Sequence, residues 1–189
     1  MVCITPPEAR LISLVNQYRR DNNLFPLRAS AILMESAQQW ADYMASEDYF
    51  SHTGPDGSSH QDRAEALGYE GGVGANILYG QPTPEAAFEA WRKSPPHNDN
   101  LLSPHYQEIG VALLVEPDWD GQGDVYATAA MELGTGTSAL AQTCRGDEIP
   151  EQTRPPRPRK KPRNPNPEPE FPQRKQRRLL RRILRRLGR

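Results

Sequence analysis

Charged residues are segregated along this chain of 189 residues, and the segregation limits what it can fold into. The segment from Glu151 to Arg189 carries 15 Lys and Arg against 3 Asp and Glu, a net charge of +12. Residues 1–150 carry 8 basic against 21 acidic residues, a net charge of −13. Eight of the 19 prolines also lie after residue 150. These counts exclude one uniform domain and predict an acidic folded body followed by a basic, proline-rich tail.

The sequence holds no apolar run near the ~20 residues of a membrane-spanning helix, so no segment is expected to cross a bilayer. The N-terminal stretch MVCITPPEARL has neither a basic n-region nor an apolar h-region, and no signal peptide is visible in it. The two cysteines, Cys3 and Cys144, flank the acidic body. Two interpretations of them stay open: a disulfide, which would imply an oxidising compartment, or two free thiols.

Capping residues and apolar spacing predict four helices. Their starts are the capping box Thr5-Pro6-Pro7-Glu8, Ser30, the capping box Ser59-His60-Gln61-Asp62, and Thr83-Pro84. Their ends are Asn22-Asn23 for the first, Gly68 for the third and Ser94-Pro95-Pro96 for the fourth.

Alternating apolar residues predict strands over 76–79, 109–115 and 125–133. The turn before the last strand contains Asp118, Asp120 and Asp124, but it lacks the register and closing glutamate of a calcium loop, so we interpret it as a solvated hairpin turn. Helices and strands in mostly non-alternating order indicate an α+β layered domain over 1–145. A proline-rich linker over 146–173 and a basic helix over 174–189 are expected to follow.

Histidine is the residue type that most invites a functional interpretation, at His52, His60, His97 and His105. None forms a tight zinc motif, and the chain has no nucleophile elbow and no phosphate-binding glycine loop. A single histidine is more often a surface or turn residue than a ligand. Two of the four lie in distinctive segments, however: His52 in Phe50-Ser51-His52-Thr53-Gly54 and His97 in Ser94-Pro95-Pro96-His97-Asn98.

The chain resembles the CAP superfamily (cysteine-rich secretory, antigen-five and pathogenesis-related proteins), and within it the bacterial SCP-like domains. The resemblance runs from about Glu8 to Gly134 in the order of the family. The matching segments are Leu14-Val15-Asn16-Gln17-Tyr18-Arg19, Ser51-His52-Thr53-Gly54, Asp56-Gly57-Ser58-Ser59, Arg63, Gly68-Tyr69, Gly74-Ala75-Asn76-Ile77, Trp91-Arg92-Lys93-Ser94-Pro95-Pro96-His97 and Ile109-Gly110-Val111.

The resemblance implies a three-layer α–β–α sandwich with a central antiparallel sheet and a shallow cleft, in which two histidines and two glutamates can meet around a divalent metal. By position, His52 and His97 correspond to the two histidines. The first glutamate would stand where this chain has Ala75, next to Asn76, and the second where it has Ser94. Both carboxylates are therefore replaced.

The replacements weaken a catalytic interpretation. Two neutral imidazoles supply fewer ligands than a catalytic zinc normally has, and no general base is evident. Ser94 beside His97 has no orienting acid. We expect a non-enzymatic binding module in the extracellular space or cell envelope, with at most weak zinc binding by His52 and His97. The alternatives are a metal-dependent hydrolase or protease that uses these histidines and, by family analogy, a carrier of a small lipid or sterol.

The last 16 residues, RKQRRLLRRILRRLGR, predict a cationic amphipathic helix. One face carries Leu179, Leu180, Ile183, Leu184 and Leu187, and the other carries Arg177, Arg178, Arg181, Arg182, Arg185 and Arg186. An anionic membrane or envelope polyanion suits both faces. Nucleic acid leaves the apolar face unexplained, and a third alternative is that the tail folds back onto the acidic body.

Overall fold

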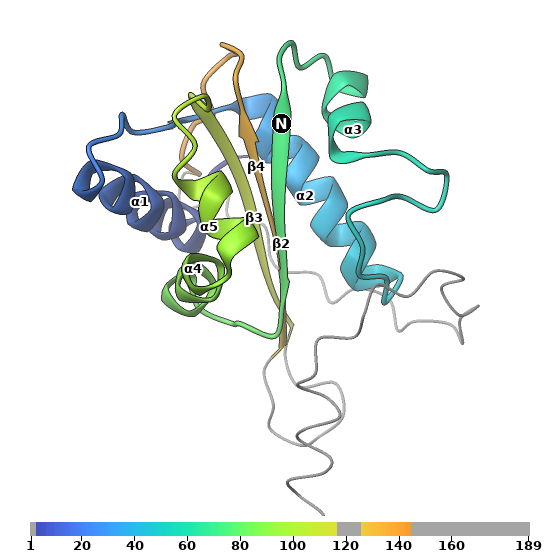
Figure 1. Ribbon diagram of the computed structural model, residues 1–189. Coiled ribbons are helices and arrows are strands. Elements are labelled where there is room, and N and C mark those ends of the chain that lie inside the picture. The colour runs from blue at the N-terminus through green and yellow to red at the C-terminus, as the bar shows by residue number, and fades with distance from the viewer. Residues whose placement is uncertain (1–2, 117–125, 145–189) are drawn as a thin grey trace, which may run out of the picture. The chain divides into compact units, whose positions relative to one another are not determined.

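A computed structural model of the chain describes residues 3–116 and 126–144 (Figure 1). The predicted turn with Asp118, Asp120 and Asp124 lies outside the described residues. So do the linker over 146–173 and the basic tail over 174–189, and the predicted domain boundaries stay predictions.

The described residues form five helices and four strands. The helices are α1 (Pro6–Asp21), α2 (Ala31–Ser46), α3 (His60–Ala66), α4 (Pro84–Lys93) and α5 (Pro95–Leu101). The strands are β1 (Arg28–Ala29), β2 (Val73–Tyr79), β3 (Glu108–Glu116) and β4 (Tyr126–Gly134). No helix in these ranges combines the length and apolarity needed to cross a bilayer.

The predicted helix starts are confirmed by their capping contacts. Glu8 Oε2 accepts hydrogen bonds from the backbone N–H and the hydroxyl of Thr5, each at 2.8 Å. The Ser30 and Thr83 hydroxyls each accept one from the backbone three residues on, at 3.1 Å. Ser59 and Asp62 form the second capping box. These bonds satisfy N–H groups that a helix leaves unpaired at its start.

Two elements differ from the sequence-based expectation. The prolines expected only to end α4 also begin α5, because proline lacks the N–H that the first turn of a helix does not need. Strand β1 pairs in parallel with β3, so the sheet is antiparallel only in its β3–β4–β2 part.

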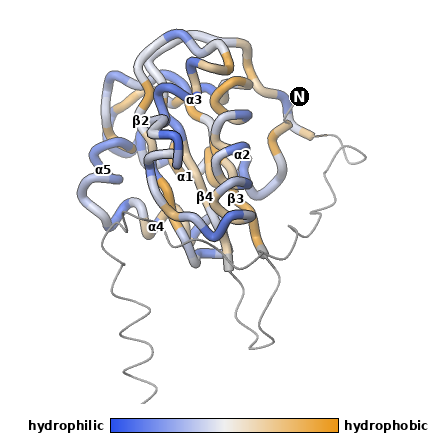
Figure 2. The backbone as a smooth tube through the Cα atoms, turned by 90° about the vertical axis from the view of Figure 1, so that its right-hand side faces the viewer, coloured by the Kyte–Doolittle hydropathy of each residue, from blue (hydrophilic) through white to orange (hydrophobic). Residues whose placement is uncertain are grey.

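The sheet has the strand order β1-β3-β4-β2 and lies between two helical layers. Helices α1, α4 and α5 cover one face, and α2 and α3 cover the other (Figure 1). Figure 2 shows apolar stretches along β3 and β4, whereas α5 is a hydrophilic segment. This is the expected three-layer α–β–α sandwich.

Successive side chains of β4 point to opposite faces of the sheet, so the strand contributes to the core on both faces. Met131 and Leu133 pack with Trp91 of α4, whereas Ala130 packs with Trp40 of α2. Helix α2 lies unusually close to the sheet at Gly110 of β3, where a Cβ would collide with the Leu33 backbone. Only glycine allows such an approach.

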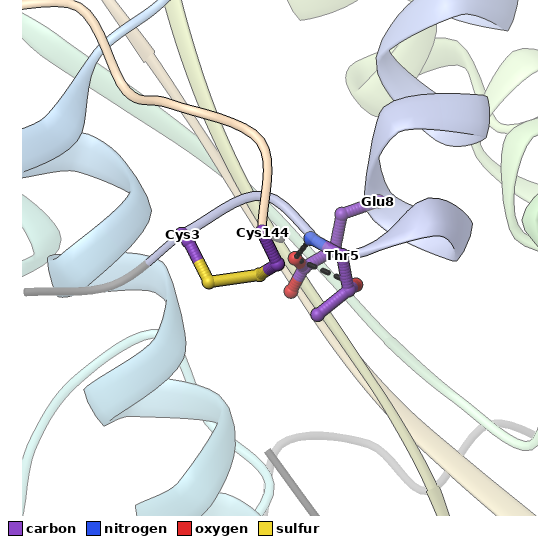
Figure 3. The surroundings of a disulfide bond; sticks show 4 residues. All are labelled: Cys3, Thr5, Glu8 and Cys144. Atoms are coloured by element: carbon purple, nitrogen blue, oxygen red, sulfur yellow. Dashed lines mark hydrogen bonds between the residues drawn. A yellow bond between two sulfur atoms is a disulfide. The ribbon is translucent and has the colours of Figure 1, made fainter. Parts of the chain in front are cut away.

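A disulfide between Cys3 and Cys144 joins the two ends of the described domain (Figure 3). The backbones beside it pair as well, because Ile4 donates to the Gln142 carbonyl at 2.8 Å and accepts from the Cys144 N–H at 2.9 Å. The bond closes a loop across a sequence separation of 141 residues. In the chain-entropy model such a closure contributes about 4–5 kcal/mol.

Candidate functional site

The loop that carries His52 follows α2 and is held by side chains from two helices. The Trp40 indole N–H donates to the Ser51 carbonyl at 3.2 Å. The Arg63 guanidinium of α3 donates to the His52 carbonyl at 3.2 Å and to the Ser58 carbonyl at 3.0 Å. The loop therefore has a defined backbone although it contains no regular element.

Three of the four histidines gather around this loop. The rings of His52 and His60 lie 6.4 Å apart between centroids. Burial lowers the pKa of His97, and the nearby His52 lowers it further. Burial likewise lowers the pKa of His60, with a smaller opposing contribution from the Val73 backbone and further lowering by His52. All three are half-buried, whereas His105 is exposed on the segment after α5.

His97 is fastened to the edge strand β2 by an amide pair. The Asn76 side chain donates to the His97 carbonyl at 3.0 Å. The Asn100 amide donates to Asn76 Oδ1 at 2.8 Å and to the Ala75 carbonyl at 3.4 Å. These bonds place α5, and with it His97, beside Ala75.

The family resemblance implies a carboxylate at positions 75 and 94, but neither residue there carries one. Ala75 is half-buried on β2, and Ser94 ends α4 and precedes α5 without a side-chain cap. No group of three or more His, Cys, Asp or Glu side chains in residues 3–116 and 126–144 is arranged to hold a metal ion. The side chains present therefore do not fit the metal that the family resemblance implies.

A carboxylate does stand next to Ala75, on the neighbouring strand. Glu132 of β4 is directly opposite Ala75 of β2 in the register, with Gly110 of β3 on its other side. The sequence gives no sign of it, because Glu132 lies within the apolar run that predicts β4. The histidine His60 was missed as a site residue because only the fold brings it to His52.

Burial dominates the chemistry of Glu132, which is 2% exposed. Burial raises its pKa to about 7, against smaller lowering by Ser36 and by the positive charge of Arg63. The Ser36 hydroxyl lies on the same side but does not complete a hydrogen bond, since Ser36 Oγ and Glu132 Oε2 are both buried without a partner. The carboxylate is therefore costly to ionise.

Stability is expected to depend on pH through Glu132. Its pKa in the folded state is above the ordinary 4.5, so its contribution is fully present below pH 4.5 and is lost as pH rises through 7. We expect Glu132→Gln to gain about 3 kcal/mol of unfolding free energy relative to the native chain between pH 4.5 and 7.5. Urea titrations of both proteins across this range measure the difference, and a difference independent of pH would contradict it.

A glutamate restored at position 75 is expected to clash electrostatically with Glu132, because side chains directly opposite on antiparallel strands lie roughly 5 Å apart at Cβ. At pH 8 we expect Ala75→Glu to cost about 1–2 kcal/mol more in the native background than in Glu132→Gln. Ala75→Gln is the uncharged control and should show no such coupling. Equal costs of Ala75→Glu in both backgrounds, by urea unfolding, would refute the interaction.

Comparisons with known proteins identify the family and the fold. The family model "CAP: Cysteine-rich secretory protein family" matches residues 12–131. The uncharacterized protein YkwD of Bacillus subtilis (strain 168) is 34% identical over 108 residues, which are 57% of this chain and 42% of that protein.

Two solved structures share the fold. An extracellular protein containing an SCP domain from Bacillus anthracis str. Ames is 23% identical with a TM-score of 0.57, over 68% of this chain and 40% of that one. An outer surface protein from Borrelia burgdorferi is 19% identical with a TM-score of 0.56, over 67% of this chain and 90% of that one. The chain thus spans less than half of the first two relatives. The chain resembles a bacterial SCP domain in fold. Since the family model covers more than half of its residues, the chain belongs to the CAP family of cysteine-rich secretory proteins.

Proposed function

We propose that this CAP domain is an extracytoplasmic binding module without enzymatic activity. The observation that carries the proposal is the chemistry around His52, His60 and His97: alanine and serine stand at the two implied carboxylate positions. A hydrolase needs a group that accepts a proton from the attacking water. Glu132, the carboxylate beside Ala75, is too deeply buried to contact a substrate.

The disulfide and the relatives support the location outside the cytoplasm. Disulfides persist in oxidising compartments, and the Cys3–Cys144 bond closes nearly the whole domain. Two proteins of the same fold are described as extracellular and as an outer surface protein.

We expect the dissociation constant of the histidine site for zinc to be higher than micromolar. We also expect the chain to cleave neither esters nor peptides. Calorimetric zinc titration of the full chain, of His52→Ala/His97→Ala and of His105→Ala as the exposed control tests the first part. A panel of esters and peptides, with and without zinc, tests the second. Micromolar binding that only the double variant loses, together with cleavage by the native chain, would establish the metal-dependent hydrolase instead.

We further propose that residues 174–189 attach the domain to an anionic membrane or envelope polyanion. Arginines on one predicted face suit phosphate headgroups, and leucines on the other suit the acyl boundary. The linker over 146–173 would then act as a semi-extended tether.

Liposome flotation tests the attachment. At low salt the full chain is expected to float with anionic vesicles, and the chain ending at Pro150 is not. Replacing the four leucines and the isoleucine of the apolar face by serine is expected to abolish flotation, whereas nucleic-acid binding would survive that change because it depends on the arginines. Equal flotation of the full and shortened chains would refute the proposal.

A further inference from the structure

The side chain of Arg63 contacts the His52 loop near both of its ends. Its two terminal nitrogens donate to the carbonyls of His52 and Ser58, which bracket the loop. Between them the loop closes on itself, because the Gly54 N–H donates to Ser58 at 2.7 Å and the Gly57 N–H donates to Gly54 at 2.9 Å. Displacing the guanidinium would remove one hydrogen bond from each end of the loop.

Arg63 is itself held by an aromatic ring. Its guanidinium carbon lies 3.7 Å from the centroid of the Trp40 ring, in a cation–π contact. The same indole donates to the Ser51 carbonyl, so ring and guanidinium together bind three carbonyls of one loop. The contact therefore holds the guanidinium against the Trp40 ring.

Glu132 lies on the same side of the sheet as this contact, because it is two residues from Ala130 on β4 and Ala130 packs with Trp40. Burial lowers the pKa of Arg63, and the largest opposing contribution comes from Glu132. Asp56, Asp62 and Tyr49 act in the same direction more weakly, and the two aspartates are exposed to solvent. Arg63 is in turn the charged group that acts on Glu132.

The two groups attract each other without touching. Arg63 Nε and Glu132 Oε2 are both buried and lack a hydrogen-bond partner, and no ion pair within 4.0 Å joins the two side chains. In a low-dielectric interior a charge still acts over such a separation, whereas water would screen it at the surface.

We propose that Glu132 is a positioning residue for His52, acting through Arg63. The carboxylate of β4 draws the guanidinium inward onto Trp40, and the guanidinium holds the loop that presents His52 to His60 and His97. The inference does not depend on the proposed binding function, because it concerns only how the site is held.

A packing role for Glu132 makes the opposite prediction for two variants. Glutamine keeps the shape of the side chain and removes its charge, whereas aspartate keeps the charge and leaves a void. If Glu132 acts by charge, Glu132→Gln loosens the loop and Glu132→Asp does not. If it acts by filling space, the order is reversed.

Native-state hydrogen exchange at pH 8 distinguishes the charge role of Glu132 from the packing role. For the Gly54 and Gly57 amides we expect Glu132→Gln to lower protection roughly three- to tenfold, and Glu132→Asp to stay within about twofold of the native chain. Core amides of β3 in the same samples report global stability. They should be protected at least as well in Glu132→Gln, since that variant removes a buried charge.

Glu8→Gln is the matched control, because Glu8 is also a buried glutamate but caps α1 on the other face of the sheet. It should leave the Gly54 and Gly57 amides unchanged relative to the core. The proposal is overturned if Glu132→Gln leaves the protection of the Gly54 and Gly57 amides unchanged, or if both Glu132 variants lower it equally. It is also overturned if the protection of these amides changes only by the same factor as that of the β3 core amides.

Discussion

The close contact between α2 and Gly110 of β3 determines the geometry of the face that carries the histidine site. A side chain at Gly110 would occupy the space of the Leu33 backbone, so only glycine permits the helix to lie there. The same helix carries Ser36 and Trp40 on its buried side. Ser36 therefore lies against Glu132, and Trp40 lies under Arg63. Because interiors are close-packed, a shift of α2 would move all of these groups together.

Hydrophobic spacing and capping signals were sufficient to predict most of the fold, but they failed where the signal was short or ambiguous. Helix α5 was missed because Pro95 and Pro96 end one helix and begin the next. Strand β1 has two residues, too few for an alternating pattern. The pairing of Cys3 with Cys144 left no local signal, because it joins residues 141 positions apart.

The site could be predicted from sequence only where a motif contained it. His52 and His97 lie in recognisable segments, whereas His60 and Glu132 become neighbours of the site only when α3 and β4 pack against α2. A single glutamate in an apolar run gives no sign of its partner. Its importance follows from burial, register and charge, which are properties of the folded chain.

The part of the chain that the structure describes contains three buried glutamates, and their polar contacts differ. Glu8 accepts two hydrogen bonds from Thr5, and Glu108 accepts from the Ser138 N–H at 2.7 Å and from Arg28 at 3.1 Å. Glu108 Oε2 and Glu132 Oε2 are both buried without a partner, but Glu108 has an ion pair with Arg28, whereas no ion pair within 4.0 Å joins Glu132 to a basic side chain in the described residues. A buried carboxylate without a direct partner costs several kcal/mol unless it stays protonated, so a purely structural position would favour an apolar residue. A neutral side chain opposite it, Ala75, avoids adding a second charge on the same face. A glutamate at position 75 would instead place a second carboxylate directly opposite Glu132 on the same face of the sheet, where like charges destabilise each other.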